Sequence, residues 1–555
     1  MKRVSWSVGL AAVVLCGCLE KSSRSTSDAP FLQLHWAGST NILKGGTNAA
    51  KLQQVFKLPS TAAVRGEVLA KLSRVPQELW RKSLPAAAPA GATASAPTLQ
   101  SLLEDLWQNE SRVTVQGKPE QPDLLLAAKL DAAQADTWSK NLSRLAEAWK
   151  LGSASAAGPT AKWSVGKRDL HIHYAREGEW TFAAFTQSPK SPFSQSSATG
   201  PSLGGAILDL RADWRRLGAA FPVLAKYPLP PSHIKVMPRG AALRTEAKLT
   251  YSERLPIKLE PWKIPTNLVS EPLISFSCAQ GIQPLLDQVK GFSKLRLKNP
   301  PNQYCTWALG TVYAQTFLAA PMPNTTNVIA EIAGRLPEFV GAYFTNPPGN
   351  FLWISNRAEW IWSGLPMVVP HVRTALSGEQ EYLLAGLFPA PQSSNSSPAE
   401  LFAQIIGRTN LLYYDWELTD QRLPQARHTF QLVDIINGRQ LQSTNFATQR
   451  WIGELAPLLG NTVTEVTLNG PKELSLVRKS DMGLTGFEIA LLGRWIDSPR
   501  FPFQYEPPPL LRTGTGRPAT STNRLNAPRP AGVESNRITA PKPVTNSAPP
   551  PKKEQ

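Results

Sequence analysis

The segment Leu124-Leu125-Leu126-Ala127-Ala128, together with the residues that follow it over 131–149, decides the class of fold. A short apolar run of this kind is typical of a buried strand. In the next segment apolar residues recur at helical steps, which predicts a helix with one buried face. That stripe consists of Trp138, Leu142, Leu145 and Trp149. A strand, a long helix and then more strands indicate an α+β fold, with antiparallel sheets covered by helices.

Three consecutive strands are predicted after this helix, over 163–165, 170–175 and 180–186. A similar order of elements recurs later in the chain. Tyr382-Leu383-Leu384-Ala385-Gly386 precedes a predicted helix over 399–406 and a strand over 411–418. The sequence therefore leaves open two similar α+β halves.

Length and composition indicate several domains. The chain has 555 residues, of which 42% are hydrophobic and 50 are proline. A first α+β domain is expected over 31–265, with an Ala/Pro-rich linker at 85–97, and a second over 266–497. The Pro-rich, basic segment 498–555 contains too few large apolar residues for a core and is predicted to be a disordered tail.

The N-terminal segment carries an export signal. Lys2 and Arg3 precede a short apolar run that ends in Leu15-Cys16-Gly17-Cys18. This ending resembles the lipobox of bacterial lipoproteins. The resemblance implies that residues 1–18 are the signal peptide, that Cys18 carries the lipid anchor, and that 19–30 form a tether. Leu19 follows the cysteine, which in this class favours the outer membrane, facing the periplasm or the surface.

A second resemblance concerns the start of the body. His35-Trp36-Ala37-Gly38 is similar to an early His-Trp-x-Gly element of large uncharacterised bacterial lipoproteins. That resemblance implies no activity. We therefore expect a protein of the cell envelope, held at the membrane by its lipid and carrying a body of unknown function.

The formal net charge is +18, and the pI is about 9.8. The tail contributes Arg512, Arg517, Arg524, Arg529, Arg537, Lys542, Lys552 and Lys553. In an envelope, the partners available to such a segment are anionic polymers or anionic lipids, and nucleic acid is not expected. The alternative interpretation is that the charge only provides solubility.

Cys278 and Cys305 are the two cysteines of the body. An oxidising envelope favours a disulfide between them. Cys278 lies in an apolar run that resembles a strand, so two buried free thiols are the alternative.

Motifs for catalysis or metal binding are weak. Ser164-Val165-Gly166-Lys167 fits Ser-x-x-Lys, but the companion Ser-Asp-Asn and Lys-Thr-Gly motifs of penicillin-interacting enzymes are absent. His171 and His173 are two potential ligands on one strand face, without a third nearby. Asp209 and Asp213 flank a strand-to-helix turn, where capping explains them. No catalytic residue, metal site or cofactor is therefore predicted.

The 17 tryptophans are the remaining indication of a binding surface. Trp353, Trp360 and Trp362 fall in one predicted hairpin, over 351–355 and 359–363. If these side chains are exposed, they form a stacking surface for sugars or acyl chains, and if they are buried, they belong to the core.

These observations favour a membrane-anchored, exported lipoprotein that acts as a non-enzymatic binding or scaffolding module of the envelope. The alternative is an envelope hydrolase that acts on wall glycans or lipids, with a site assembled from residues that the sequence does not identify.

Overall fold

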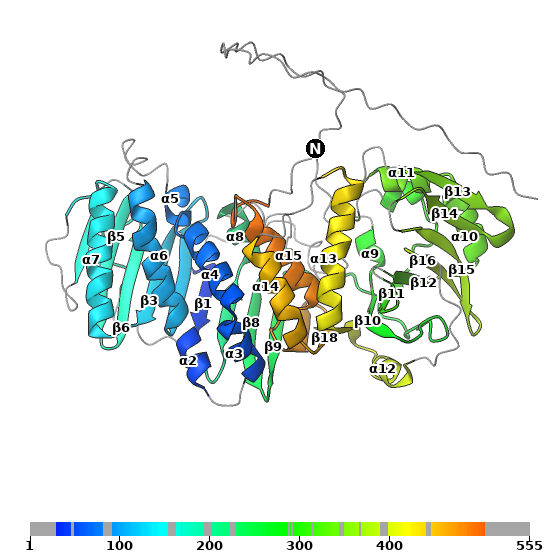
Figure 1. Ribbon diagram of the computed structural model, residues 1–555, viewed down its shortest axis with the longest axis horizontal. Helices are drawn as coiled ribbons and strands as arrows, with labels where there is room; N and C mark the ends of the chain where they lie inside the picture. The colour runs from blue at the N-terminus through cyan, green and yellow to red at the C-terminus, as the bar shows by residue number, and fades with distance from the viewer. Residues whose placement is uncertain are drawn as a thin grey trace, which may run out of the picture. The chain divides into compact units, whose positions relative to one another are not determined.

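The computed structural model describes residues 29–45, 49–80, 92–153, 162–167, 169–193, 202–220, 229–286, 289, 292–312, 315–342, 349–365, 368–388, 398–439 and 446–505 (Figure 1). Within these ranges the protein is a mixed α+β fold dominated by one antiparallel sheet of 19 strands. The predicted signal peptide, Cys18 and residues 506–555 of the predicted tail lie outside the described residues. Residues 498–505 of that tail are described and contact the body, with the ring centroids of Phe501 and Trp495 4.9 Å apart.

Nine strands belong to the first half of the chain. They are β1 (Leu32–Trp36), β2 (Ser111–Lys118), β3 (Gln121–Lys129), β4 (Trp163–Lys167), β5 (Leu170–Glu177), β6 (Trp180–Thr186), β7 (Leu208–Ala212), β8 (Ser232–Arg239) and β9 (Ala242–Thr250).

Ten strands follow in the second half. They are β10 (Leu273–Gln280), β11 (Gln303–Leu309), β12 (Thr316–Pro321), β13 (Asn350–Ile354), β14 (Glu359–Ser363), β15 (His371–Ser377), β16 (Gln380–Gly386), β17 (Leu411–Leu418), β18 (Asn461–Gly470) and β19 (Glu473–Ser480).

The strands follow one another across the sheet in an order that the pairings define. From one edge to the other it runs β4, β5, β6, β3, β2, β1, β7, β8, β9, β19, β18, β17, β10, β11, β12, β16, β15, β14 and β13. The β9–β19 pair joins the two halves, with Leu243 opposite Ser480 and Thr250 opposite Glu473. The sheet is therefore continuous across residue 265, and the division into two domains stays a prediction.

Thirteen helices of five or more residues lie in the described ranges. They are α2 (Ser39–Lys44), α3 (Ala50–Lys57), α4 (Pro59–Leu72), α5 (Val75–Leu79), α6 (Ala92–Gln108), α7 (Ala132–Ala148), α8 (Trp214–Ala220), α10 (Thr325–Ala333), α11 (Leu336–Gly341), α12 (Ala399–Ala403), α13 (Thr419–Ile436), α14 (Ala447–Leu455) and α15 (Gly486–Asp497). Within the described ranges, no helix has both the length and the apolar character needed to cross a membrane.

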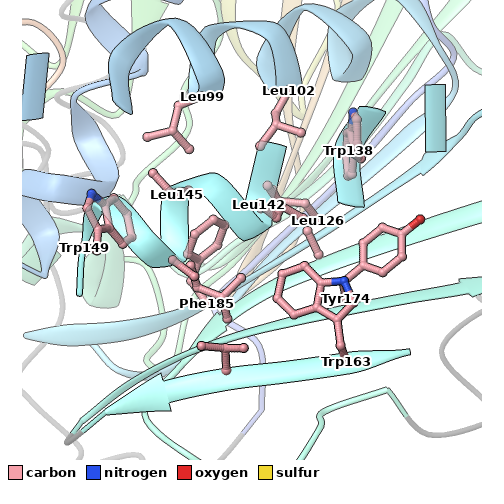
Figure 2. Packing of buried hydrophobic residues seen from close by; sticks show 14 of the residues in the cluster. Leu99, Leu102, Leu126, Trp138, Leu142, Leu145, Trp149, Trp163, Tyr174 and Phe185 are labelled. Carbon is pink, nitrogen blue, oxygen red and sulfur yellow. The ribbon is translucent and has the colours of Figure 1, made fainter. Parts of the chain in front are cut away.

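The first-half core confirms the predicted stripe on α7. All four residues of that stripe are fully buried, and they pack with α6 onto strands β3, β5 and β6. Figure 2 shows Leu142 and Leu145 of α7 directed toward Leu126 and Phe185 of the sheet. Asp131 begins the helix as its N-cap and forms a capping box with Gln134.

Strand alternation gives the first half of the sheet two different faces. On one face, Leu126 and Phe185 point to α6 and α7. On the same face, Ala212 packs with Leu217 of α8, and Leu243 packs with Leu52 of α3. We call this the helix face. Neighbouring residues such as His35 and Asp209 point to the other side, which we call the row face.

In the second half, apolar cores lie on both sides of the sheet. Phe276, Cys278 and Trp307 pack with Phe402 of α12 on one side. On the other side Tyr251, Ala279 and Val466 form a separate cluster. Helices α13, α14 and α15 form a further core together with Val64 of α4, which connects the helical layers of the two halves.

Three predicted elements differ from the structure. Short apolar runs in the sequence also predict strands over 485–491 and 429–432. The first segment is part of α15, and the second lies inside α13. The last six residues of the predicted linker 85–97 begin α6, because alanine is the strongest helix former.

Candidate functional site

A row of polar side chains crosses the row face of the first half. Arg112 of β2 lies opposite His35 of β1, which lies opposite Asp209 of β7. The row continues with Lys235 of β8 opposite Asp209 and Glu246 of β9 opposite Lys235. We call these five residues the charged row. Its members come from five strands and form a continuous line only after the strands pair.

Ion pairs connect parts of this row. Lys235 Nζ lies 3.5 Å from Asp209 Oδ2, and His233 Nε2 lies 2.8 Å from Asp209 Oδ1. Arg244 Nε donates to Glu246 Oε1 over 2.6 Å. The side chains of the row are therefore held in defined positions on the sheet.

At one end the row meets an aromatic ring. The Arg112 guanidinium carbon lies 4.6 Å from the centroid of the Trp180 ring, and Lys129 Nζ lies 5.4 Å from it. The His35 ring meets the same indole edge-on, at 6.4 Å. Trp180 is opposite Lys129 in the β3–β6 ladder. Two cations thus lie against one indole ring, an arrangement worth about 0.5–2 kcal/mol for each cation.

Glu110 holds this end of the row together. It accepts hydrogen bonds from His35 Nε2 over 2.9 Å and from Lys129 Nζ over 2.7 Å. Burial alone would raise the pKa of Glu110, but these hydrogen bonds outweigh it, and the pKa lies below its usual value. Burial lowers the pKa of His35, so the bond to Glu110 joins a neutral imidazole to a carboxylate. We call His35, Glu110, Arg112, Lys129 and Trp180 the Trp180 cluster.

The element His35-Trp36-Ala37-Gly38 explains how the cluster is built. Trp36 stacks on Trp107 with ring centroids 5.3 Å apart, and its Nε1 donates to the Trp107 carbonyl over 2.8 Å. Gly38 has a φ of 88°, and a Cβ there would lie 2.6 Å from the backbone carbon of Asn109. Only glycine permits this approach. The element fixes β1 against the end of α6 and so places His35 beside Glu110.

The predicted aromatic hairpin exists, and its tryptophans lie on one face of the sheet. Trp353 is opposite Trp360, with ring centroids 5.9 Å apart. Trp360 and Trp362 are each 8% exposed, whereas Trp353 is 37% exposed. Two of the three rings therefore belong to the core, which is the alternative that the sequence left open, and Trp353 alone is accessible.

Cys278 and Cys305 lie directly opposite each other in the β10–β11 ladder. Both thiols are free in the structure and fully buried, and burial raises the pKa of each. Opposite residues of an antiparallel pair have Cα atoms about 4.5–5.5 Å apart, which suits a disulfide. The bridge itself stays a prediction.

The two residues of the Ser-x-x-Lys motif separate in the structure. Ser164 and Lys167 are three residues apart on β4, so strand alternation directs their side chains to opposite faces. His171 and His173 lie on one face, with ring centroids 6.2 Å apart. Asp213 Oδ1 accepts from the Arg216 backbone N–H over 3.2 Å, as capping requires. In the described part of the chain, no group of three or more His, Cys, Asp or Glu residues is placed to hold a metal ion.

Sequence reasoning missed a pair of buried acids on β17. Asp415 Oδ1 accepts a hydrogen bond from Ser277 Oγ over 2.5 Å. Glu417 Oε1 accepts two, from Thr419 Oγ1 over 2.9 Å and from the Gly486 backbone N–H over 2.6 Å. Burial and then the neighbouring Asp415 raise the pKa of Glu417 to about 7. The overlooked signal was the alternation Asp415-Trp416-Glu417, which places two acids on one face of a strand. Since Glu417 binds the first turn of α15, we assign this pair to the attachment of that helix.

A surface hollow of about 370 Å³ lies between α13 and α14, lined by Asp420, Pro424, Arg427, Ile452, Gly453, Ala456 and Pro457. It contains one carboxylate and one guanidinium, with no nucleophile beside them. The hollow therefore offers a small mixed surface without a reactive group.

No protein-family model matches the chain, and no curated protein or solved structure matches it significantly. The function must therefore be argued from the residues themselves, and the Trp180 cluster with the charged row is the strongest candidate site that they form.

Proposed function

We propose that the protein is an exported lipoprotein, anchored through Cys18, whose body acts as a non-enzymatic binding or scaffolding module of the cell envelope. The lipobox-like sequence supports the anchor and a position at the outer membrane. The Trp180 cluster is the single observation that supports binding, because it places two cations at a fixed site on a sheet face.

The chemistry of the cluster favours an anionic partner. A guanidinium that lies against an indole ring loses little side-chain freedom when it binds a carboxylate or phosphate. Lys129 adds a second positive charge, which Glu110 orients and offsets, so the cluster has a net charge of +1. A row of fixed charges on a sheet suits an extended polymer better than a small molecule, which needs a concave site. We therefore propose acidic envelope polymers, or anionic lipid headgroups, as the ligand class.

The basic tail is proposed as a second contact with the same partners. It contains eight Lys and Arg residues and three Glu residues over 506–555. Attraction of this kind is strong at low ionic strength and is screened by salt over about 10 Å at 0.1 M. The tail would add affinity, while the Trp180 cluster would define the position of the polymer on the body.

We further propose that the body consists of two similar halves. Strands β1, β2, β3, β6, β5 and β4 pair in the same order as β10, β11, β12, β16, β15 and β14. In each half the next three strands then extend the sheet from its first strand. Among the described residues of the first half, β13 has no counterpart. The acids on β17 and the charged row show that the halves carry different side chains.

Two variants test the binding proposal. Arg112→Gln should weaken binding to an acidic polysaccharide about tenfold, because one charged contact is worth about 1.5 kcal/mol. Lys140→Gln removes an equal charge from α7, where Lys140 pairs with Asp136, and should leave binding unchanged. Equal affinities of the wild type and Arg112→Gln for the polysaccharide would refute the Trp180 cluster as the binding site.

The anchor has its own test. Cys18→Ser should release the protein from the membrane fraction or leave the signal peptide attached. Mature Cys18→Ser protein that stays fully in the membrane fraction would contradict the lipoprotein proposal.

The two proposed ligand sources are distinguished by offering anionic-lipid vesicles and a soluble acidic polysaccharide separately to the purified protein.

A further inference from the structure

Ser164 and His173 form a side-chain pair at the edge of the sheet. They lie directly opposite each other on β4 and β5, and Ser164 Oγ lies 2.8 Å from His173 Nδ1. Ser164 is exposed, whereas His173 is only 1% exposed. An accessible hydroxyl therefore rests on an imidazole that the protein holds in place.

The second nitrogen of the ring determines the direction of this hydrogen bond. His173 Nε2 lies 3.1 Å from the Ser188 carbonyl oxygen, which can only accept, and 2.9 Å from Thr186 Oγ1. Thr186 donates its own hydroxyl proton to the same carbonyl over 2.8 Å, so its oxygen is available as an acceptor. Nε2 therefore carries the hydrogen. Burial lowers the pKa of His173, which keeps the ring neutral with a lone pair on Nδ1.

This arrangement has the polarity of a nucleophile and its general base. The Ser164 hydroxyl donates to Nδ1, and the Thr186 and Ser188 oxygens orient the ring from the far side. Within the described residues β4 pairs with β5 alone, so alternate backbone N–H groups of β4 point away from the sheet. Such groups can donate to the oxygen of a carbonyl that approaches along this edge.

We propose that Ser164 is a nucleophile, activated by His173, that accepts acyl groups from esters. The Ser164 Oγ–H proton moves to His173 Nδ1 as Oγ bonds to the ester carbonyl carbon. The ester C–O bond then breaks, and the departing alkoxide takes the proton from Nδ1 and leaves as an alcohol. Water then gives a proton to His173 Nδ1 as its oxygen bonds to the acyl carbon. The bond between that carbon and Ser164 Oγ breaks, Oγ takes the proton back from Nδ1, and the acyl group leaves as a carboxylic acid. With this activity the body is an enzyme, which replaces the non-enzymatic part of the proposed function; the binding of an anionic partner at the Trp180 cluster does not depend on it.

The test uses the full-length protein in detergent and a fluorophosphonate probe, with the modified residue located by mass spectrometry. Ser164 should be labelled in the wild type. Ser202→Ala, which removes another exposed serine, should leave the labelling of Ser164 unchanged. His173→Gln should slow it at least a hundredfold, the usual contribution of a general base. Absence of an adduct at Ser164, or equal rates in a folded His173→Gln protein, would overturn the proposal.

A second variant leaves His173 in place. In Ser164→Cys, the imidazole should favour the thiolate, so that iodoacetamide reacts at least tenfold faster there than with the exposed thiol of Ser202→Cys. Equal rates of alkylation would overturn the proposal, even if His173→Gln does not fold.

Discussion

Glu417→Gln should stabilise the protein in alkaline solution, because it removes a buried charge and keeps the hydrogen bonds. The Glu417 side chain is only 3% exposed, and its Oε1 accepts from Thr419 Oγ1 and from the Gly486 backbone N–H. A glutamine Oε1 can accept both bonds. Ionising the native carboxyl is unfavourable because burial and the adjacent Asp415 raise its pKa to about 7, from 4.5 in the unfolded chain.

The size and sign of the effect follow from these two values. Between pH 4.5 and 7 the folded protein keeps a proton on Glu417 that the unfolded chain has released, so stability falls as the pH rises through this window. A shift of this size corresponds to on the order of 3 kcal/mol. Once the pH is well above 7, the stability that the protonated Glu417 carboxyl contributes is lost completely. Glu417→Gln should therefore be more stable than the wild type by up to about 3 kcal/mol at pH 8, and similar to it at pH 4.

Urea unfolding at pH 4 and pH 8, followed by tryptophan fluorescence, measures this difference. Glu465→Gln is the control, because Glu465 is partly exposed and pairs with Arg408 at the surface. That variant should change stability by no more than about 1 kcal/mol at either pH. If Glu417→Gln showed the wild-type pH dependence, or destabilised the protein at pH 8, Glu417 would be a stabilised anion and the reasoning would be wrong.

Three other predictions concern the fold. Gly38→Ala should lower the free energy of unfolding by roughly 1–3 kcal/mol more than Gly178→Ala does, as measured in thermal melts. Both glycines have a positive φ, but only Gly38 faces close backbone atoms, so equal losses of stability would exclude the close contact. Deleting 506–555 should leave the melting temperature of the body nearly unchanged and weaken binding to acidic polymers at low salt, whereas a large drop in melting temperature would show that the tail packs on the body. Protein purified from an oxidising compartment and then unfolded should show no free thiol from Cys278 or Cys305, and two titratable thiols there would rule out the bridge.

Sequence patterns correctly predicted those helices and strands whose signal lies within one short stretch of the chain. The apolar stripe at helical steps over 131–149 correctly indicated α7, which Asp131 caps in the structure. The hairpin of β5 and β6 followed from the two strands predicted over 170–175 and 180–186. The same reasoning failed for α15, where a short apolar run was interpreted as a strand. Thr485 and Glu488 form a capping box there, and their spacing was the signal that should have indicated a helix.

Features that depend on strand pairing could not be predicted from local patterns. His35 and Glu110 are 75 positions apart, and the charged row needs five strands in register. The order of the strands also changes the comparison of the halves. In the proposed arrangement of two halves, the strand order matches β3 with β12 rather than with β16, so the segment 124–128 is compared with β12 and not with the segment 382–386. Short sequence similarity cannot make that distinction.

Oxidative footprinting with an acidic polysaccharide tests the proposed binding surface most directly. The protein is exposed to hydroxyl radicals with and without the polymer, and the oxidation of each tryptophan is measured by mass spectrometry. Protection of Trp180, with Trp353 unchanged, is the result predicted from the Trp180 cluster. Protection of Trp353 with Trp180 unchanged would place binding on the aromatic hairpin and contradict the proposed site.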